Sequence, residues 1–210
     1  MVITKLLINE GDAVREGQVL AVLDSYTGQE AMVARLEAEL GNAEAEYRRN
    51  EDLYKKNFVS VSERDTWKTR VEVARANLKQ AEAELDFSVV RSPMDGQVLA
   101  VHARPGERVG PDGIAELGRT DQMYAVAEVY ETDIGKVRLG QRASVSSPVF
   151  SGALQGTVER IGMKIGKRDV LDVDPAADAD ARVVEVHIQL DDSQPVRGLT
   201  YLQVEVRIHL

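Results

Sequence analysis

The feature that most constrains this chain is a long helical repeat in residues 29–87. This segment contains no proline and one glycine, and alanine, glutamate, leucine, arginine and lysine dominate it. Within it, mostly apolar residues recur at alternating spacings of three and four, which is the pattern of the a and d positions of a coiled coil. The two runs are Val33, Leu36, Leu40, Ala43, Tyr47, Asn50 and Tyr54, and then Trp67, Val71, Ala74, Leu78, Ala81 and Leu85.

These two runs predict two helical arms. Each arm covers about four heptads, or roughly 40 Å at about 1.5 Å per residue. A seam that is two positions wide per heptad can be covered by one partner helix. The break at residues 57–60 (NFVS) is short enough for the arms to fold back on each other. We therefore expect an antiparallel helical hairpin over residues 28–87.

The residues on either side of this hairpin resemble each other. Both flanks read as short strands broken by glycine-containing turns. A half of about 25 residues cannot bury a core alone, whereas two halves can pack as a sandwich with pseudo-two-fold symmetry. The sequence thus predicts one small β-sandwich, in residues 1–27 and 88–118, with the hairpin inserted at its middle. The matching stretches are 11–14 (GDAV) with 106–109 (GERV), 20–23 (LAVL) with 114–117 (IAEL), and 3–7 with 98–102.

Residues 119–210 form a second β region. A helical turn is expected at residues 131–137, and residues 169–181, which hold five aspartates, are expected to form a loop. The fold class that follows is mainly β with one inserted α-helical coiled-coil hairpin. The strand candidates in this region are 123–129, 142–149, 154–161, 183–190 and 201–209.

Composition and motif searches argue against several classes of function. With 35 acidic and 26 basic residues the net charge is −9, which disfavours nucleic acid or an anionic membrane surface as the main partner. The chain has no cysteine, its histidines (His102, His187 and His209) are far apart, and residues 169–181 lack the pattern of a calcium-binding EF-hand loop. No catalytic triad order or phosphate-binding loop occurs. We expect no metal site, no cofactor and no enzymatic activity.

Two motifs flank the predicted hairpin. Residues 11–21 (GDAVREGQVLA) are similar to a half-motif of lipoyl and biotinyl domains, and residues 90–96 (VRSPMDG) to a re-entry motif, V-x-A-P-F-D-G, from which Ser92 and Met94 depart mildly. In this order they resemble the periplasmic adaptors, also called membrane fusion proteins, of the HlyD/AcrA type. A lipoyl-carrier function is disfavoured, because residues 24–28 (DSYTG), where the hairpin is inserted, hold no lysine for modification.

The resemblance extends into the second β region. Residues 131–134 (ETDI), residues 140–141 (GQ) and Gly198 are similar to the barrel signatures of the same family. The resemblance implies a split lipoyl-like β-sandwich followed by a β-barrel domain in residues 119–210. Residues 175–186 (PAADADARVVEV) resemble a stretch of the DevB-type adaptors, which work with ABC exporters.

Three residues around the predicted hairpin tip form a further motif. Arg49, Leu53 and Ser60 have the spacing Arg-x3-Leu-x6-Ser, which resembles the motif by which adaptors meet an outer-membrane channel of the TolC type. Arginine supplies forked donors, leucine a dry contact and serine a donor or acceptor. Structural roles compete with this one: Ser60 opens a capping box with Glu63, Leu53 covers part of the seam, and Arg49 is a solvated charge.

As a whole, the resemblance implies an adaptor that bridges an inner-membrane exporter, ABC type favoured, to a TolC-type channel. It implies a hexameric ring in the periplasm and an inner-membrane anchor that lies outside this chain, in which no apolar run of about 20 residues occurs. One alternative is an adaptor of a proton-driven, RND-type pump. The other is a coiled-coil scaffold that carries a lipoyl-like module and has no role in transport.

Overall fold

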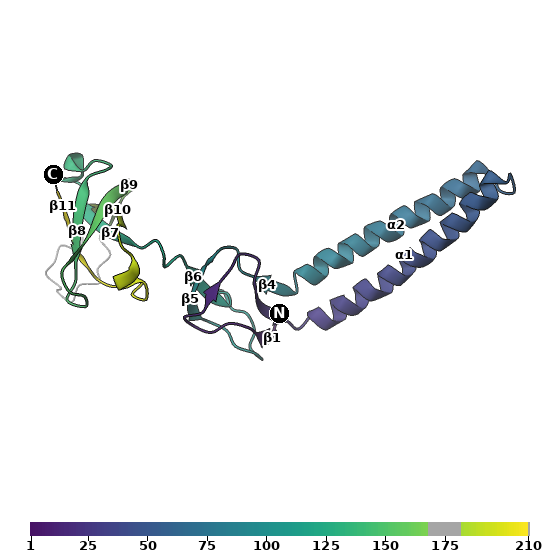
Figure 1. Cartoon of the computed structure of the whole chain (residues 1–210), viewed down its shortest axis with the longest axis horizontal. Helices are drawn as coiled ribbons and strands as arrows, with labels where there is room; N and C mark the ends of the chain where they lie inside the picture. The colour runs from purple at the N-terminus through teal and green to yellow at the C-terminus, as the bar shows by residue number, and fades with distance from the viewer. Residues whose placement is uncertain (168–181, 210) are drawn as a thin grey trace. The chain divides into compact units, whose positions relative to one another are not determined.

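The computed structural model describes residues 1–167 and 182–209. Contacts divide the chain into two compact units, Met1–Leu117 and Gly118–Leu210. The first unit contains the hairpin and two small sheets, and the second contains one larger sheet (Figure 1).

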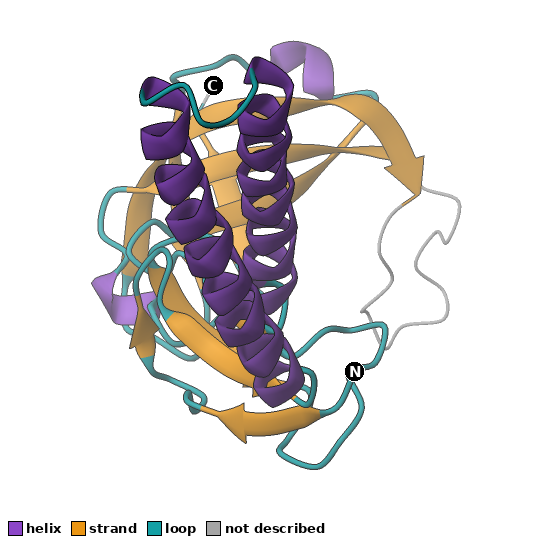
Figure 2. Cartoon of the chain, turned by 90° about the vertical axis from the view of Figure 1, so that its right-hand side faces the viewer, coloured by secondary structure: helices purple, strands orange, loops and turns teal. Residues whose placement is uncertain are grey.

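The hairpin consists of helix α1 (Tyr26–Lys55) and helix α2 (Val61–Asp86), which lie side by side along their length (Figures 1 and 2). Every seam position expected from the sequence is buried or half-buried, which confirms the coiled-coil hairpin. With its 30 residues, α1 is about 45 Å long. An ion pair of 3.0 Å between Arg75 and Glu44 also joins the two helices.

Each small sheet combines strands from before and after the hairpin. In one sheet β3 is the central strand, with Val22 opposite Val89, and in the other β2 pairs with β5. Neither sheet is complete without both flanks, so the expected split sandwich is confirmed. The sheets are β1 (Ile3–Leu6), β3 (Val19–Leu23) and β4 (Val89–Arg91), and β2 (Ala13–Val14), β5 (Gly96–Val101) and β6 (Ala115–Gly118).

The internal repeat appears in the hydrogen bonds of the sandwich. Gly11 and Gly106 occupy matching turns with φ of +88° and +89°, a conformation that favours glycine. Ile3 and Val98, both 1% exposed, hold equivalent places in the two halves of the core. The repeated backbone bonds are Gly106 N–H to Ile3 O (2.8 Å) and Ile3 N–H to Glu107 O (2.9 Å), matched by Gly11 N–H to Val98 O (2.8 Å) and Val98 N–H to Asp12 O (2.9 Å).

The second unit is a five-stranded antiparallel half-barrel sheet in the order β11-β8-β9-β10-β7. Its core is aliphatic, and Val145, Val158, Val186 and Ile188 are each at most 1% exposed. The elements are β7 (Tyr124–Tyr130), the 3-10 helix η1 (Ile134–Lys136), β8 (Arg142–Ser146), β9 (Ala153–Lys167), β10 (Arg182–Leu190), η2 (Gln194–Val196) and β11 (Glu205–Ile208).

Some strand limits expected from the sequence are wrong. The strand expected at 142–149 ends at Ser146, and that expected at 201–209 begins only at Glu205. The late start has a physical reason: Tyr201 has a φ of 63°, a left-handed conformation that is incompatible with a strand. All of the expected loop at 169–181 and most of the DevB-like stretch at 175–186 lie outside the described residues.

Candidate functional site

The end of α1 is fixed by a turn with a left-handed residue. Asn57 has a φ of 62°, and its N–H donates to the carbonyl of Tyr54 at 2.8 Å. The N–H of Phe58 reaches back to the carbonyl of Leu53 at 2.9 Å. These are the two bonds of a Schellman motif, in which asparagine is a common substitute for glycine. The loop between the helices therefore has a defined backbone.

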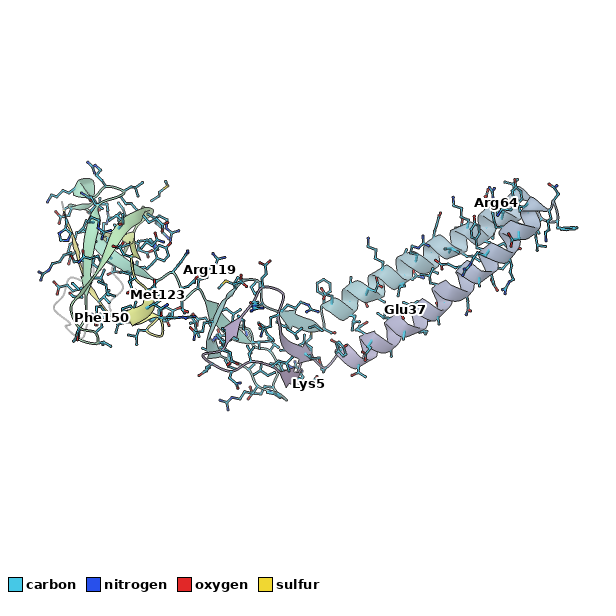
Figure 3. All side chains as sticks on the ribbon, in the orientation of Figure 1. Lys5, Glu37, Arg64, Arg119, Met123 and Phe150 are labelled. Carbon is cyan, nitrogen blue, oxygen red and sulfur yellow. The ribbon has the colours of Figure 1, made fainter. Side chains whose placement is uncertain are left out.

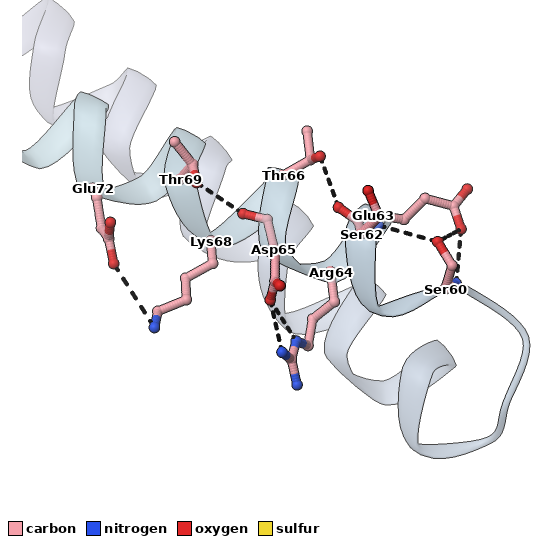
Figure 4. Close-up of polar contacts among 9 residues, drawn as sticks. All are labelled: Ser60, Ser62, Glu63, Arg64, Asp65, Thr66, Lys68, Thr69 and Glu72. Atoms are coloured by element: carbon pink, nitrogen blue, oxygen red, sulfur yellow. Dashed lines mark hydrogen bonds and ion pairs between the residues drawn. The ribbon is translucent and has the colours of Figure 1, made fainter.

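The start of α2 is fixed by a reciprocal cap between Ser60 and Glu63 (Figure 4). The Glu63 N–H donates to Ser60 Oγ at 3.2 Å, while the Ser60 N–H and hydroxyl donate to Glu63 Oε2 at 2.8 and 3.0 Å. The capping-box prediction is thus confirmed. The hydrogen bonds from Ser60 also lower the pKa of the Glu63 carboxyl below its usual value.

This cap limits what the Ser60 side chain can offer a partner. A hydroxyl has one hydrogen to donate and two lone pairs to accept with. The hydrogen and one lone pair are used within the cap. Ser60 could therefore accept one further hydrogen bond from a partner while the cap stays intact.

Arg49 and Leu53 lie on one face of α1, four residues apart and off the seam. The Arg49 side chain is 71% exposed, and its ion pair with Glu46 is long, at 4.0 Å. Leu53 is 41% exposed, so the seam covers only part of it. An exposed ion pair contributes little, about 0–1 kcal/mol, and leaves the guanidinium free to take another acceptor.

Two further apolar residues, which no sequence motif indicated, are exposed at the tip. Phe58, in the loop after α1, is 74% exposed, and Val61, the first residue of α2, is 51% exposed. The sequence does contain one indication of this exposure. Phe58 lies in the break between the two seams, where no partner helix can cover an aromatic side chain. We call Leu53, Phe58 and Val61 the tip patch.

The last seam contact below the tip is a stacked pair. The guanidinium carbon of Arg64, on α2, lies 4.7 Å from the centroid of the Tyr54 ring, on α1. Arg64 also donates two hydrogen bonds to Asp65, which raise the pKa of the guanidinium. Figure 3 shows Arg64 near the closed end of the hairpin. The tip thus rests on a pair of helices that are held together directly beneath it.

The rest of the described chain offers little chemistry. A groove of about 380 Å³ runs between the helices beside Tyr47 and Val71, but most of its lining is charged, unlike the apolar lining of most ligand sites. In residues 1–167 and 182–209, no histidine, aspartate or glutamate cluster could hold a metal ion. Over the same residues, no helix has the length and apolar character of a membrane span. The hairpin tip is therefore the strongest candidate site.

Comparison with known proteins gives matching folds. The family model of the CzcB-like barrel-sandwich hybrid domain matches residues 1–115. Among solved structures, a MacA–MexA chimera that contains the Pseudomonas aeruginosa MexA α-hairpin aligns with a TM-score of 0.74 at 20% identity, over 99% of this chain and 72% of the chimera. The membrane fusion protein Spr0693 from Streptococcus pneumoniae aligns with a TM-score of 0.70 at 18% identity, over 100% and 91% of the two chains.

Curated relatives include one protein named for export and one named for metal resistance. The chain is 28% identical to the pyoverdine export membrane fusion protein PvdR of Pseudomonas aeruginosa, over 82% of this chain and 50% of PvdR. It is 24% identical to the cobalt-zinc-cadmium resistance protein CzcB of Cupriavidus metallidurans, over 80% of this chain and 35% of CzcB. The chain thus spans half of PvdR and about a third of CzcB.

Proposed function

Because this chain belongs to the family of membrane fusion proteins with a CzcB-like barrel-sandwich hybrid domain, we propose that it is part of a periplasmic adaptor of an efflux system. The adaptor would link an inner-membrane transporter to a TolC-type outer-membrane channel, and would carry out no chemistry itself. An anchor outside this chain would hold it at the inner membrane. The single observation that carries the proposal is a long hairpin, inserted into a split sandwich, whose tip is exposed and has a fixed backbone.

In this proposal, Arg49, Leu53 and Ser60 meet the channel. The exposed guanidinium of Arg49 would donate paired hydrogen bonds to carbonyl or carboxylate oxygens at the rim of the channel. Leu53 would supply apolar contact beside it, and Ser60 would accept one hydrogen bond while it keeps capping α2. Geometry supports these roles, because none of the three side chains lies in the buried seam.

One tip is a small contact, so the proposal needs several copies. A hexameric ring would present its tips together, and many weak contacts would then act as one strong contact. The isolated chain is expected to be mainly monomeric, because assembly would depend on the channel and the transporter. Sedimentation velocity at micromolar concentration checks this, and a stable tight dimer would count against it.

We favour an ABC exporter as the inner-membrane partner, and an RND-type pump is the alternative. The support for an ABC exporter is the DevB-like stretch at 175–186, of which only residues 182–186, in β10, are described. Among the relatives, PvdR is named for pyoverdine export and CzcB for metal resistance. Co-purification of the full-length protein from its own cells would decide, since one transporter class should be retained with it.

A crosslinking experiment tests the docking role of the hairpin. This chain has no cysteine, so one introduced by Lys56→Cys at the tip can carry a benzophenone label. Lys79→Cys, on an exposed position of α2 away from the tip, is the matched control. In intact cells, the tip label should crosslink the outer-membrane channel and the control should not. Equal crosslinking from both positions, or none from either, would refute docking through the tip.

A further inference from the structure

The most exposed apolar side chain at the hairpin tip is that of Phe58, which is 74% exposed. We propose that Phe58, supported by Leu53 and Val61 in the tip patch, is the main apolar anchor that seats the tip on the outer-membrane channel. The seat on the channel would be an apolar depression rimmed by carboxylates. This inference rests on the proposed adaptor function and adds to it a determinant of affinity and the chemistry of the partner surface.

The exposure of Phe58 is unusual for its place in the turn. In a Schellman motif, the residue after the left-handed position commonly packs on the helix residue whose carbonyl it bonds, which here is Leu53. Phe58 nevertheless keeps 74% of its surface in solvent and Leu53 keeps 41%. The turn is closed by its backbone bonds, so the aromatic ring is available for a partner.

The backbone on both sides of Phe58 is already fixed. The left-handed Asn57 and its bond to Tyr54 precede it, and the reciprocal cap between Ser60 and Glu63 follows it. A side chain presented from an ordered turn loses less conformational entropy on binding than one on a loose loop. Aromatic residues, phenylalanine among them, and arginine are also enriched at protein interfaces. Phe58 and Arg49 supply both at this tip.

The charge around the tip patch differs in sign from the chain as a whole. Residues 48–63, which include Glu63 of the cap, carry four basic and three acidic side chains, a net charge of +1, whereas the whole chain has a net charge of −9. The Lys55–Asp52 pair is long, at 3.8 Å, and both of its side chains are more than half exposed. A basic end on an acidic protein complements an acidic partner surface. The basic residues are Arg48, Arg49, Lys55 and Lys56.

A protein partner explains these features better than an anionic membrane does. Each basic residue close to such a membrane contributes about 1 kcal/mol, so the small charge excess of the tip would give weak binding. The tip patch has only three apolar side chains, one in the last turn of α1, one in the loop and one at the start of α2, and it has no long amphipathic face. A compact apolar centre ringed by charge is typical of a protein–protein contact.

The test compares two phenylalanines of nearly equal exposure. Phe58 is 74% exposed at the tip, and Phe87 is 77% exposed at the opposite end of the hairpin, after α2. The full-length protein is immobilised densely, so that weak contacts add, and each TolC-type channel of the source organism is passed over it in lipid nanodiscs. Phe58→Ala should weaken binding at least about tenfold, and Phe87→Ala should leave it nearly unchanged. Phe58→Leu should retain most of the binding, and higher salt should weaken the wild type.

Several results would overturn the inference. If Phe58→Ala binds the channel as tightly as the wild type, or if Phe87→Ala loses as much affinity, Phe58 is not the anchor. Docking through the tip would still stand in either case if Arg49→Ala abolishes binding. A wild-type protein that binds no channel refutes the adaptor function and the anchor together. Vesicles of phosphatidylglycerol and phosphatidylethanolamine form the second arm. Binding to these vesicles that depends on Phe58, without binding to a channel, would show that the partner is a membrane.

Discussion

Ser60 and Glu63 exchange three hydrogen bonds across the first turn of α2, so each residue holds the other in place. Ser60 belongs at the same time to the motif proposed to meet the channel. Its substitution should therefore disturb folding as well as docking, unlike substitutions at Arg49 or Leu53.

Replacement of Ser60 by alanine should destabilise the hairpin. The loss of an N-cap side chain costs about 1 kcal/mol, with a usual range of about 0.5–2 kcal/mol. Ser62→Ala is the matched control, because the Ser62 side chain has no capping role and lies on the exposed surface of the same turn. Thermal and urea unfolding followed by circular dichroism measures both. Equal stability of the two variants would show that the cap contributes nothing.

The contribution of the cap should depend on pH. Because hydrogen bonds from Ser60 lower the pKa of Glu63 in the folded state, the stabilisation is present at neutral pH and is lost as the pH falls through that lowered pKa. The difference in stability between wild type and Ser60→Ala should therefore shrink in acid. A Glu63→Gln variant should not show this pH dependence. The same difference at pH 7 and well below the pKa of a free glutamate would contradict the prediction.

Arg49→Ala and Leu53→Ala should abolish export and leave folding nearly intact. Both side chains are exposed and off the seam, so the free energy of unfolding should change by no more than about 0.5 kcal/mol. Arg35→Ala is the matched control, since Arg35 is an exposed, ion-paired arginine on the same helix away from the tip. Export from cells and thermal unfolding are measured in parallel. If either tip variant unfolds, its residue is structural and the docking assignment fails.

Truncation of a buried seam side chain should, unlike the tip variants, destabilise the hairpin. Leu36 is only 8% exposed, and removal of such a side chain costs about 2–5 kcal/mol, because it loses buried apolar surface and leaves a cavity. We expect Leu36→Ala to fall near the lower end, because the seam is only one layer deep. Met32, on the same helix and 40% exposed, gives a control in Met32→Ala. Similar losses of unfolding free energy for Leu36→Ala and Met32→Ala would mean that this seam does not hold the two helices together.

Glycine-to-alanine substitutions should have opposite effects on stability in the turns and in the helix. Gly11→Ala and Gly106→Ala should each destabilise the sandwich by about 1 kcal/mol or more, because alanine is strained at φ near +90°. Gly41→Ala should instead stabilise the hairpin by about 1 kcal/mol, since Gly41 lies inside α1 and an added Cβ meets no atom within 4 Å. Unfolding free energies measure all three variants. A loss at Gly41 as large as that at Gly11 would contradict the assignment of strain to the turns.

Much of the first unit could be predicted from sequence because its signals are local or repeated. The alternating three- and four-residue spacing of the seam, which includes Leu36 and Leu40, predicted the buried face of α1. The Ser60–Glu63 pair predicted the start of α2. The similarity of residues 11–14 to 106–109 predicted that distant segments would meet in one sandwich. Each of these patterns depends on local geometry or on a repeated motif, and the structure confirms all three.

Other features depend on conformations that no pattern reveals. The alternation of residues 201–209 favours a strand throughout, but the left-handed backbone at Tyr201 delays β11 to Glu205. The exposure of Phe58 depends likewise on the left-handed turn at Asn57 and on the way that both helices end. Helical periodicity says which residues face the partner helix, but not how a loop residue between two helices is oriented.

The division of the sandwich into two separated halves also has a consequence during synthesis. When the ribosome has made β1–β3, half of the small core exists without its partner strands, and it must wait for the whole hairpin before β4 and β5 emerge. When the two helices pair along the seam, the start of α1 and the end of α2 come together. This removes most of the entropy cost of closing the long segment between β3 and β4. The coiled coil would then act as a folding guide for the newly made chain, and a weakened seam should delay closure of the sandwich.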